Sequence, residues 1–549
     1  MRTKIFFVIT LLFVMNQAPA QRLVKDLNTG SGDANPSGFM VLGSRLLFSA
    51  EDPDHGRELW ISDGTESGTF MLKDINTGSA GSDPVLIDTI SGRMLFFAES
   101  GSLGREMWST DGTEAGTYML GDLNTGSGDG CINNLGYGRT GNVYIWPVAS
   151  SAYGKELFKT DGTPAGTSLL EDICPGSGNG IHAMPGYAAV LDSLLIFTCQ
   201  GISGSSTQLW RTDGTEAGTY WVRTFDNYPG SMVSLDSIVI FEAYQTTSGY
   251  ELWQTDGTNA GTTLADGSEI NPGAGSASPG DFILTDEILF FTANQGSLRR
   301  WYAYFAGSVA FIADVIPGVS DPDIYSTFSN PRHLHCNASF WVANDYIHGY
   351  ELYDLHDGFS YLPNMIRDIN PWGQSIPAHF VQTDCDHTFF TADDGEHGRE
   401  LWVSDGSSSG TRRLTDIRQG WQSSVYSAVC LMNGELFFAG HDGNHGVELM
   451  AVNMDSLLYT GLKDEGEVLI TGTYPNPAAD YLLLGPLEGN DEEILAEVSS
   501  ISGQLLISFR LQPDAGGMVR LALSGLESGL YLGRLQTTEK VYSFRFIHQ

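Results

Sequence analysis

The sequence predicts an all-β protein, in which a multi-bladed β-propeller of about nine four-stranded units precedes a small antiparallel β-sandwich. Three observations predict this fold. A motif ending in Asp-Gly-Thr recurs about every 49 residues, each repeat holds four short apolar runs between turn residues, and helical periodicity is nearly absent after residue 20. Such units bury their apolar faces only by stacking on neighbours, and closure into a ring satisfies both ends of the stack.

Composition sets the first limits on function. The chain has 549 residues, of which 41% are hydrophobic, so it can form a large core. It carries 28 Lys and Arg against 66 Asp and Glu, a formal net charge of −38. A chain this acidic repels nucleic-acid phosphates and anionic lipid headgroups, so we expect neither nucleic-acid binding nor electrostatic membrane docking.

The first 20 residues have the organisation of a secretory signal peptide. Arg2 and Lys4 precede an apolar run over residues 5–15, and residues 18–20 read Ala-Pro-Ala. This pattern predicts cleavage after Ala20. The run is about half the length of a membrane-spanning helix, and no later stretch reaches that length. The mature chain is therefore expected to be exported and to have no transmembrane segment.

Six cysteines remain in a chain bound for an oxidising compartment. Fifteen pairings are formally open, and none has the Cys-x-x-Cys spacing of zinc or thioredoxin chemistry. Cross-links between neighbouring repeats and buried free thiols are both consistent with the sequence. The cysteines are Cys131, Cys174, Cys199, Cys336, Cys385 and Cys430.

The repeat motif reads Glu-Leu-Trp-x-x-Asp-Gly-Thr in its fullest form. Near-copies begin at Glu58, Glu106, Glu156, Gln208 and Glu251, and weaker copies begin at Arg300, Glu351, Glu400 and Glu448. The first unit predicts strands at 39–42, 45–50, 58–62 and 70–75. Between its third and fourth strands, Asp-Gly-Thr-x-x-Gly-Thr predicts a hairpin whose two glycines are free to take positive φ.

The two ends of the repeat region predict how the ring closes. Residues 21–28 resemble the fourth strand of a unit, yet no first three strands precede them. The last unit, near Glu448, lacks its hairpin and fourth strand, so we expect the N-terminal strand to complete it and cover both edges. Nine units exceed the usual four to eight blades, so eight blades plus an irregular unit, two smaller propellers and an open solenoid stay as alternatives.

Two positions recur in nearly every unit. The aromatic position suggests sugar stacking, but a residue repeated in each blade is more typical of the core between blades. It is occupied by Trp60, Trp108, Phe158, Trp210, Trp253, Tyr353 and Trp402. The acidic position could form a cation-binding ring, but bonds to backbone groups of the same blade are favoured, because an unpaired inward carboxylate is costly. It is occupied by Glu58, Glu106, Glu156, Glu251, Glu351, Glu400 and Glu448.

Three Asp-rich loops are candidates for calcium, the one cofactor that the sequence suggests. They gather oxygen ligands at Asp52, Asp54, Asp393, Asp394 and Asp442. They lack the spacing and the distant bidentate Glu of an EF-hand, so Asp/Gly turns are the alternative. His55, His397 and His445 share one position in these loops and are expected to be solvent-exposed loop residues.

Enzyme signatures mostly fail inspection. There is no His-Glu-x-x-His and no P-loop, and residues 136–141 match a dinucleotide pattern without a following helix. No catalytic residue is therefore assigned. Function is expected where the repeat is least regular, at residues 294–304 and 317–350. The candidate binding residues there are Arg299, Arg300, Trp301, His333, His335 and Trp341.

Two resemblances follow from these motifs. Residues 22–458 resemble the ELWxxDGT repeat proteins, a group of secreted bacterial proteins from which no general biochemical activity can be carried over. The remaining segment reads Tyr-Pro-Asn-Pro from Tyr474, Ser-Gly-Gln from Ser502 and Gly-Leu-Tyr from Gly529, and then ends in a strand that begins at Lys540. This order resembles the C-terminal sorting domain of the type IX secretion system of Bacteroidetes.

The sorting-domain resemblance implies transit of the outer membrane with the type IX secretion machinery as partner, and a secreted or outer-membrane surface location. We therefore expect a signal peptide (1–20), a propeller (21–460), a linker (461–472) and a sorting β-sandwich (473–549). The expected function is noncatalytic binding of a glycan or protein partner. The alternatives are a polysaccharide-processing hydrolase or lyase with carboxylates in the propeller channel, and a purely structural surface-layer role.

Overall fold

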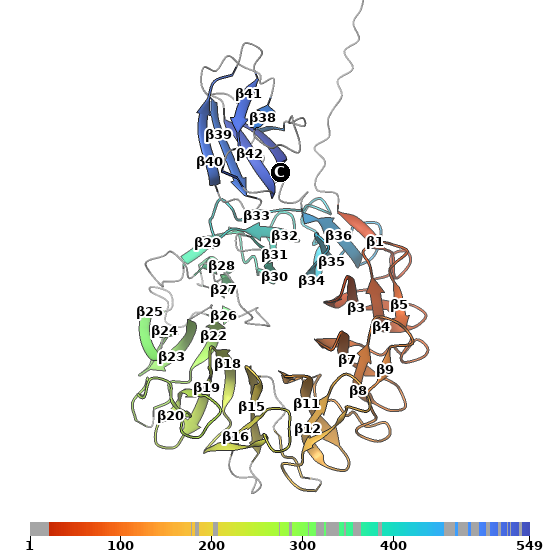
Figure 1. Cartoon of the computed structure of the whole chain (residues 1–549), viewed down its shortest axis with the longest axis vertical. Coiled ribbons are helices and arrows are strands. Elements are labelled where there is room, and N and C mark those ends of the chain that lie inside the picture. Colours follow the sequence, from red (N-terminus) through yellow and green to blue (C-terminus); the bar gives the residue numbers. More distant parts are fainter. Residues whose placement is uncertain are drawn as a thin grey trace, which may run out of the picture.

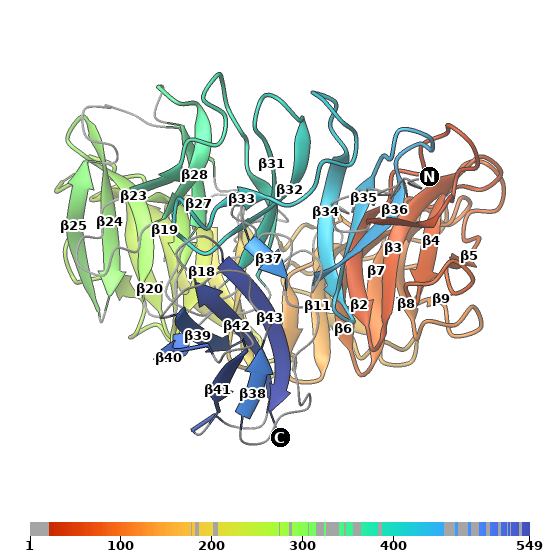
Figure 2. The same cartoon turned by 90° about the horizontal axis from the view of Figure 1, so that it is seen from above.

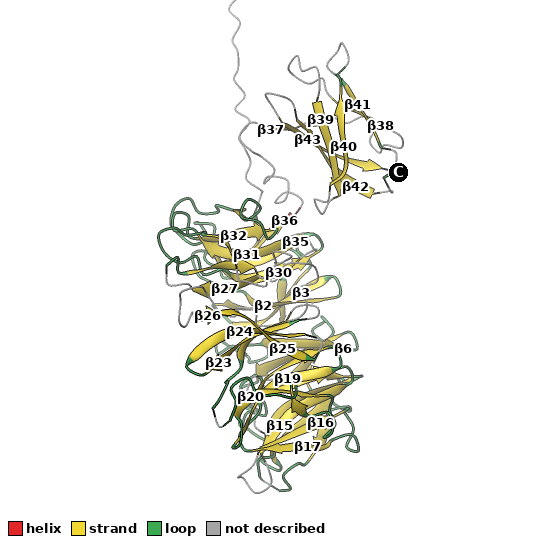
Figure 3. Cartoon of the chain, turned by 90° about the vertical axis from the view of Figure 1, so that its left-hand side faces the viewer, coloured by secondary structure: helices red, strands yellow, loops and turns green. Residues whose placement is uncertain are grey.

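A computed structural model gives the architecture of the chain, and the elements named over its described residues are β-strands (Figure 3). The predicted signal peptide lies outside the described residues. The structure describes residues 21–549 except 135, 177, 182–185, 201–206, 274, 285–287, 306, 315–322, 326–339, 345–346, 355–363, 383–386, 455–466, 470–480, 485–493, 501–504, 514–517, 524, 527–528, 537–540 and 549.

Nine four-stranded antiparallel sheets, counted over the described residues, form the blades of a β-propeller (Figure 1). Blades 1 to 4 comprise β2 (Ser37–Leu42), β3 (Arg45–Asp52), β4 (Gly56–Ser62) and β5 (Phe70–Lys73); β6 (Val85–Ile90), β7 (Arg93–Glu99), β8 (Arg105–Thr110) and β9 (Tyr118–Met119); β10 (Gly138–Thr140), β11 (Val143–Ser150), β12 (Gly154–Thr160) and β13 (Ser168–Glu171); and β14 (Ala188–Leu191), β15 (Leu194–Gln200), β16 (Thr207–Thr212) and β17 (Tyr220–Phe225).

Blades 5 to 9 continue the same order around the ring. They comprise β18 (Gly230–Leu235), β19 (Ile238–Gln245), β20 (Gly249–Thr255) and β21 (Thr263–Leu264); β22 (Gly280–Leu284), β23 (Leu289–Gln295), β24 (Leu298–Phe305) and β25 (Ser308–Asp314); β26 (Asp323–Tyr325), β27 (Phe340–Asn344), β28 (Tyr350–Asp354) and β29 (Asn364–Arg367); β30 (Ala378–Gln382), β31 (Thr388–Asp393), β32 (Arg399–Ser404) and β33 (Arg412–Arg413); and β34 (Val425–Met432), β35 (Glu435–Gly440) and β36 (Glu448–Asn453). The nine-bladed ring is confirmed, and the alternative architectures are wrong.

The N-terminal strand closes the ring as the sequence predicts. β1 (Arg22–Lys25) pairs antiparallel with β36 and becomes the fourth strand of blade 9. Arg22 pairs with Ala451 in this register, and its guanidinium lies 2.6 Å from the carboxylate of Glu435. First and last blade elements therefore share one sheet, which leaves no unpaired edge at the closure.

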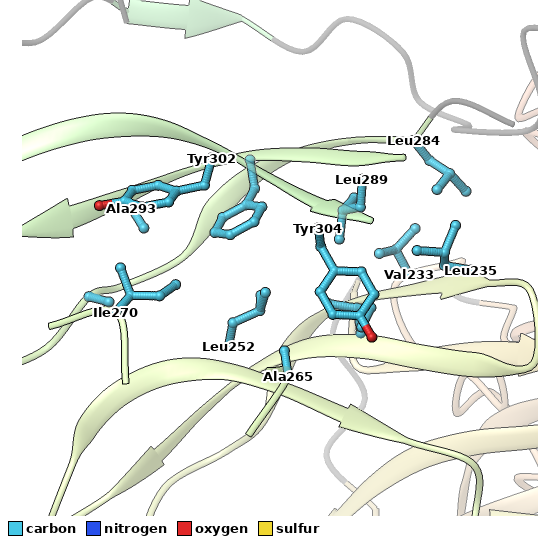
Figure 4. Close-up of a cluster of buried hydrophobic side chains, with 13 residues drawn as sticks. Val233, Leu235, Leu252, Ala265, Ile270, Leu284, Leu289, Ala293, Tyr302 and Tyr304 are labelled. Atoms are coloured by element: carbon cyan, nitrogen blue, oxygen red, sulfur yellow. The ribbon is translucent and has the colours of Figure 1, made fainter. Parts of the chain in front are cut away.

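The hydrophobic core lies between the blades rather than at one centre. Between blades 5 and 6, Leu252, Ala265 and Ile270 pack against Leu289 and Tyr302 (Figure 4). The repeated aromatic residue belongs to these layers. Trp60, for example, is 6% exposed and packs against Phe437 of blade 9. The prediction of an interblade core position is confirmed, although Trp210 is only half-buried.

The Asp-Gly-Thr hairpins form as predicted, with one correction. Asp63 Oδ1 accepts bonds from the Thr65 amide (2.9 Å) and hydroxyl (2.7 Å), and Gly64 has a φ of +94°. Gly68 does not need positive φ. A Cβ at Gly68 would instead lie 2.0 Å from Asp63 Oδ1, so this glycine is required by the close approach of the Asp side chain.

Substituting the second hairpin glycine should destabilise a blade. In blade 2, a Cβ at Gly116 would lie 2.0 Å from Asp111 Oδ1. We expect Gly116→Ala to lower the free energy of unfolding by about 1–3 kcal/mol, because the hairpin must distort to accept the methyl group. Urea unfolding measures the loss. The matched control is the same substitution in an Asp111→Ala background, where the clash is removed and the cost of Gly116→Ala should shrink.

The C-terminal segment forms two further sheets. One contains β37 (Glu467–Leu469), β39 (Ile494–Ser500), β40 (Leu505–Leu511), β42 (Gly529–Gln536) and β43 (Val541–His548), and the other pairs β38 (Tyr481–Leu484) with β41 (Val519–Ala522). Apolar side chains of both sheets share one core. β37 lies inside the predicted linker and pairs parallel with β43, so this sheet is not wholly antiparallel.

The cysteines do not form disulfides within the described part of the chain. Cys131, Cys174, Cys199 and Cys430 are free. Cys336 and Cys385 lie outside the described residues. Burial raises the pKa of the Cys131 thiol to about 11, which makes that thiol unreactive at neutral pH.

Candidate functional site

One face of the ring is built by two kinds of loop, and we call it the connection face. The hairpin between the second and third strands of a blade packs on the segment that leads to the next blade. In blade 1, the amide of Ser82 donates to the carbonyl of Arg57 (2.8 Å), and a Cβ at Gly56 would lie 2.7 Å from the amide nitrogen of Gly81. Figure 2 shows hairpins such as β31–β32 projecting at the edge of the ring.

The repeated glutamates hold these connections in place. Glu58 accepts bonds from the amides of Ile75 and Asn76 (both 3.1 Å) and from the Ser82 hydroxyl (2.6 Å). Glu448 accepts the amide of Leu27 at 2.7 Å in the same way. The predicted bonds to backbone groups are confirmed. Each glutamate therefore positions the loops of its own junction.

The calcium candidates lie on the connection face, at the tips of their hairpins. Asp52 Oδ1 accepts the amides of Asp54 (2.9 Å) and His55 (2.8 Å), and Asp393 Oδ1 accepts the amide of Gly395 (2.8 Å). Asp394 and Asp442 accept the amide three residues onward in the same manner. These bonds build Asx turns.

The histidines of the same three loops pair with these aspartates. The Nδ1 atoms of His55, His397 and His445 lie 2.8–2.9 Å from a carboxylate oxygen of their own hairpin. The hydrogen bond to Asp52 raises the pKa of His55, and the bond to Asp442 raises that of His445. Over the residues that the structure describes, no three His, Cys, Asp or Glu side chains gather as ligands for a metal ion.

The predicted binding residues do not gather at one place. Arg299 forms an ion pair with Asp281 (3.1 Å), and Arg300 donates to Gln295 (2.7 Å) on the same hairpin. Trp301 is 1% exposed in the core between blades 6 and 7, which corrects its assignment to a binding surface.

The rest of that predicted set is only partly placed. Trp341 lies in β27, opposite Tyr353. His333 and His335 lie outside the described residues.

Sequence reasoning missed the two aromatic side chains that are most exposed among the described residues of the ring. Trp372 is 84% exposed and Trp421 is 78% exposed. They lie in the connections from blade 7 to blade 8 and from blade 8 to blade 9. The equivalent turns of the connections into blades 1 and 2 carry Gly and Ser, at residues 30–31 and 78–79. An alignment of the connections would therefore have revealed both tryptophans as departures from the repeat.

The backbone beneath both indoles is held by hydrogen bonds. Asn370 Oδ1 accepts the amide of Trp372 at 3.2 Å. Arg418 donates to the Gln422 side chain at 2.7 Å and to the Ser423 carbonyl at 3.3 Å, which closes the turn around Trp421. The turns are therefore fixed while the rings face solvent.

A polar hairpin contacts both connections that carry the indoles. In blade 8, a Cβ at Gly395 would lie 2.6 Å from Asn370 Oδ1, and one at Gly398 would lie 2.8 Å from the carbonyl oxygen of Trp421. The hairpin therefore touches both connections, and Glu396 is exposed at its tip. We call Trp372, Trp421 and the hairpin of residues 393–398 the tryptophan rim.

Comparison with known families identifies the C-terminal segment. Residues 472–549 match the family described as the secretion system C-terminal sorting domain. The segment is thus a type IX secretion sorting domain, and the chain is exported to the cell surface or beyond. No curated protein matches the chain. Among the described residues, no helix has the length and apolar character to span a bilayer.

Three solved structures that align with the chain are distant from it in sequence. The computationally designed Ika8 protein is 11% identical, with a TM-score of 0.34, covering 79% of this chain and 100% of that one. The β-propeller domain of the Trilobed protease from Pyrococcus furiosus is 13% identical, with a TM-score of 0.31, covering 70% and 99%. A puromycin-hydrolyzing peptidase of Mycobacterium tuberculosis is 10% identical, with a TM-score of 0.34, covering 74% and 57%.

Proposed function

We propose that the exported propeller is a noncatalytic binding protein that recognises an oligosaccharide through the tryptophan rim. The observation that carries this proposal is the exposure of Trp372 and Trp421 on turns whose backbones are hydrogen-bonded in place. An indole left in water forgoes the burial that stabilises most aromatic side chains, so two of them on adjacent connections indicate a ligand surface.

The chemistry of the rim favours a sugar over a protein as ligand. A sugar ring has an apolar C–H face that stacks on an indole and hydroxyl groups that bond to carboxylates and amides. Glu396, Gln374 and Gln422 offer such groups beside the indoles, and all three are exposed. A protein interface would instead need a continuous apolar centre, and here a polar hairpin packs on both connections that carry the rings.

Removing either indole should weaken oligosaccharide binding. We expect Trp372→Ala and Trp421→Ala each to lower affinity about tenfold, the loss of about 1.4 kcal/mol of stacking. The measurement is binding of the chain from residue 21 to 549 on a glycan array, followed by titration calorimetry with the best ligand. Trp221→Ala is the matched control, because Trp221 is 48% exposed on the outer strand β17.

The same experiment tests the competing functions. Reducing ends released in the array wells would establish a hydrolase, and unsaturated products a lyase. Binding that survives both rim substitutions, or that Trp221→Ala weakens equally, would contradict the rim as the site. If the chain neither binds nor cleaves any glycan on the array, binding of a protein ligand or a structural role remains as its function.

We extend the proposal to calcium, the source organism and the repeat group. Asp52, Asp394 and Asp442 each hold an Asx turn, so a calcium ion would compete with the bonds of that turn. Array binding in the presence of calcium and of EDTA decides whether the ion contributes. The five well-preserved Asp-Gly-Thr repeats together with the sorting domain support an ELWxxDGT repeat protein of a member of the Bacteroidetes.

A further inference from the structure

Glu242 departs from the repeat at a position that is otherwise uncharged. The second strand of each blade has one residue directly opposite the position that is Leu in the fullest motif. Over the nine blades these residues are Ser49, Phe97, Pro147, Thr198, Glu242, Thr292, Val342, Thr391 and Ala439. Glu242 alone carries a charge, and it alone is half-buried rather than buried. A carboxylate that serves one blade cannot be part of the common scaffold.

The carboxylate of Glu242 receives no hydrogen bond from the described residues. Burial raises its pKa to about 7, and the charge of Arg299 opposes that rise. Ile240 and Leu252 share the face of the sheet on which Glu242 lies, and both belong to the core between blades 5 and 6. Figure 4 shows Leu252 in this core. The carboxylate of Glu242 therefore lies at the edge of an apolar layer without a hydrogen-bond partner. This arrangement costs free energy unless a ligand supplies the partner.

Two tyrosines lie on one side of Glu242. Gly230 is its direct partner in the neighbouring strand, and a Cβ at Gly230 would lie 3.7 Å from the ring of Tyr187. Because Gly230 has no side chain, nothing at this position separates that ring from the carboxylate. The ring of Tyr228 meets that of Tyr187 edge-on, with centroids 6.2 Å apart.

Two more tyrosines lie on the other side. Tyr244 follows Glu242 by two residues, so both side chains share one face of β19. Tyr250 pairs with Tyr244 across the strands, with ring centroids 4.9 Å apart, and Asn227 donates to the Tyr250 hydroxyl at 2.5 Å. Burial raises the pKa of the Tyr250 hydroxyl, and the charge of Glu242 raises it further, which places the two groups near each other.

The charges around Glu242 leave one negative charge unmatched. Arg299 donates to Asp281 (3.1 Å) and to the carbonyl of Ser278 (3.3 Å), and the Thr292 hydroxyl also bonds to Asp281 (2.5 Å). The guanidinium is thus balanced by Asp281, and Glu242 remains as the excess charge of the cluster. The formal charge of −38 on the whole chain adds a long-range field of the same sign.

We propose that Glu242 and the four tyrosines bind an organic ammonium group, either a protonated amine or a quaternary ammonium. Aromatic faces attract such cations, and a desolvated carboxylate supplies the counter-charge. A calcium ion would require six to eight oxygen ligands, and this cluster offers one carboxylate. An anionic ligand would meet the charge of Glu242. The site is separate from the tryptophan rim and does not depend on the function proposed for it.

Titration with small ammonium ions tests the site. The chain from residue 21 to 549 is titrated with tetramethylammonium, choline and cadaverine at pH 8 and pH 6, with calorimetry or saturation-transfer NMR as readout. We expect Glu242→Gln to weaken binding about tenfold or more. We also expect about tenfold weaker binding to the unsubstituted chain at pH 6, because only about a tenth of the carboxyl groups are then ionised.

The controls separate this site from general attraction to an acidic protein. Asp236→Asn removes the same charge from an exposed turn of blade 5 and should leave binding unchanged. Equal weakening of binding by Glu242→Gln and Asp236→Asn would overturn the proposal. The absence of binding to all three ions at pH 8 would also overturn it, provided that the thermal unfolding transition shows that the chain is folded. Displacement of the ions by neutral oligosaccharides would assign the cluster to sugar instead.

Discussion

A chain that begins at residue 29 should be much less stable than one that begins at residue 21. The missing strand carries Val24 and Leu27, which are 2% and 5% exposed against blades 9 and 1. Leaving each in water costs about 1.5–3 kcal/mol, so we expect a loss on the order of 3–6 kcal/mol. Glu448 also loses its bond from the Leu27 amide, and β36 becomes an open edge. Denaturant unfolding of both chains, followed by tryptophan fluorescence, measures the difference.

Point substitutions separate closure from the loss of residues alone. Val24→Ser should lower the unfolding midpoint strongly, whereas Leu23→Ser, one position along the same strand at a half-buried site, should lower it less. A synthetic peptide of residues 21–28 added to the shortened chain should restore part of the lost stability. Equal midpoints for the chains that begin at residues 21 and 29 would show that the ring does not need this strand.

The ring and its closure could be predicted because the signals are local and repeated. Asp63, Thr65 and Gly68 determine their hairpin through contacts within six residues, and the same chemistry returns in five further blades. The closing strand could be recognised because residues 21–28 match a fourth strand without its companions. The prediction was wrong where the same spacing of residues in the motif has two physical explanations. The glycine at Gly68 provides space for Asp63 rather than positive φ.

The candidate sites could not be predicted in the same way, because exposure depends on tertiary packing. Trp301 lies in the least regular repeat, and the sequence therefore suggests that its side chain is exposed for ligand binding. In blade 6, however, Tyr302 occupies the aromatic position and Trp301 the buried leucine position beside it. Trp372 and Trp421 lie in turns that hold small residues elsewhere, and Glu242 is abnormal only once the nine strands are superposed. These departures from the repeat are present in the sequence, but they can be recognised only when the strand register of each blade is known.

The free energy of unfolding should fall as pH rises from about 5 to about 8. Burial raises the pKa of Glu106 to about 8 and that of five other repeat glutamates to about 7, against an ordinary value of 4.5; the five are Glu156, Glu251, Glu351, Glu400 and Glu448. The folded chain therefore keeps protons that the unfolded chain releases between these values. Stability is complete below the unfolded pKa and is lost as pH rises through the folded one. Each pKa unit corresponds to about 1.4 kcal/mol, so a rise from 4.5 to about 7 corresponds to about 3 kcal/mol for one glutamate.

Glutamine substitutions distinguish this effect from general repulsion among the acidic groups. Repulsion within a chain of net charge −38 also grows with pH, but it responds alike to any lost carboxylate. Glu251→Gln should flatten the slope of unfolding free energy against pH between 5 and 8, because Glu251 is fully buried and no longer exchanges a proton. The exposed Glu66→Gln should keep the slope. Blade 4 naturally carries Gln208 at this position, so the fold accepts the amide. Equal slopes in the two variants would mean that surface repulsion, rather than the buried glutamates, governs the pH dependence of the propeller.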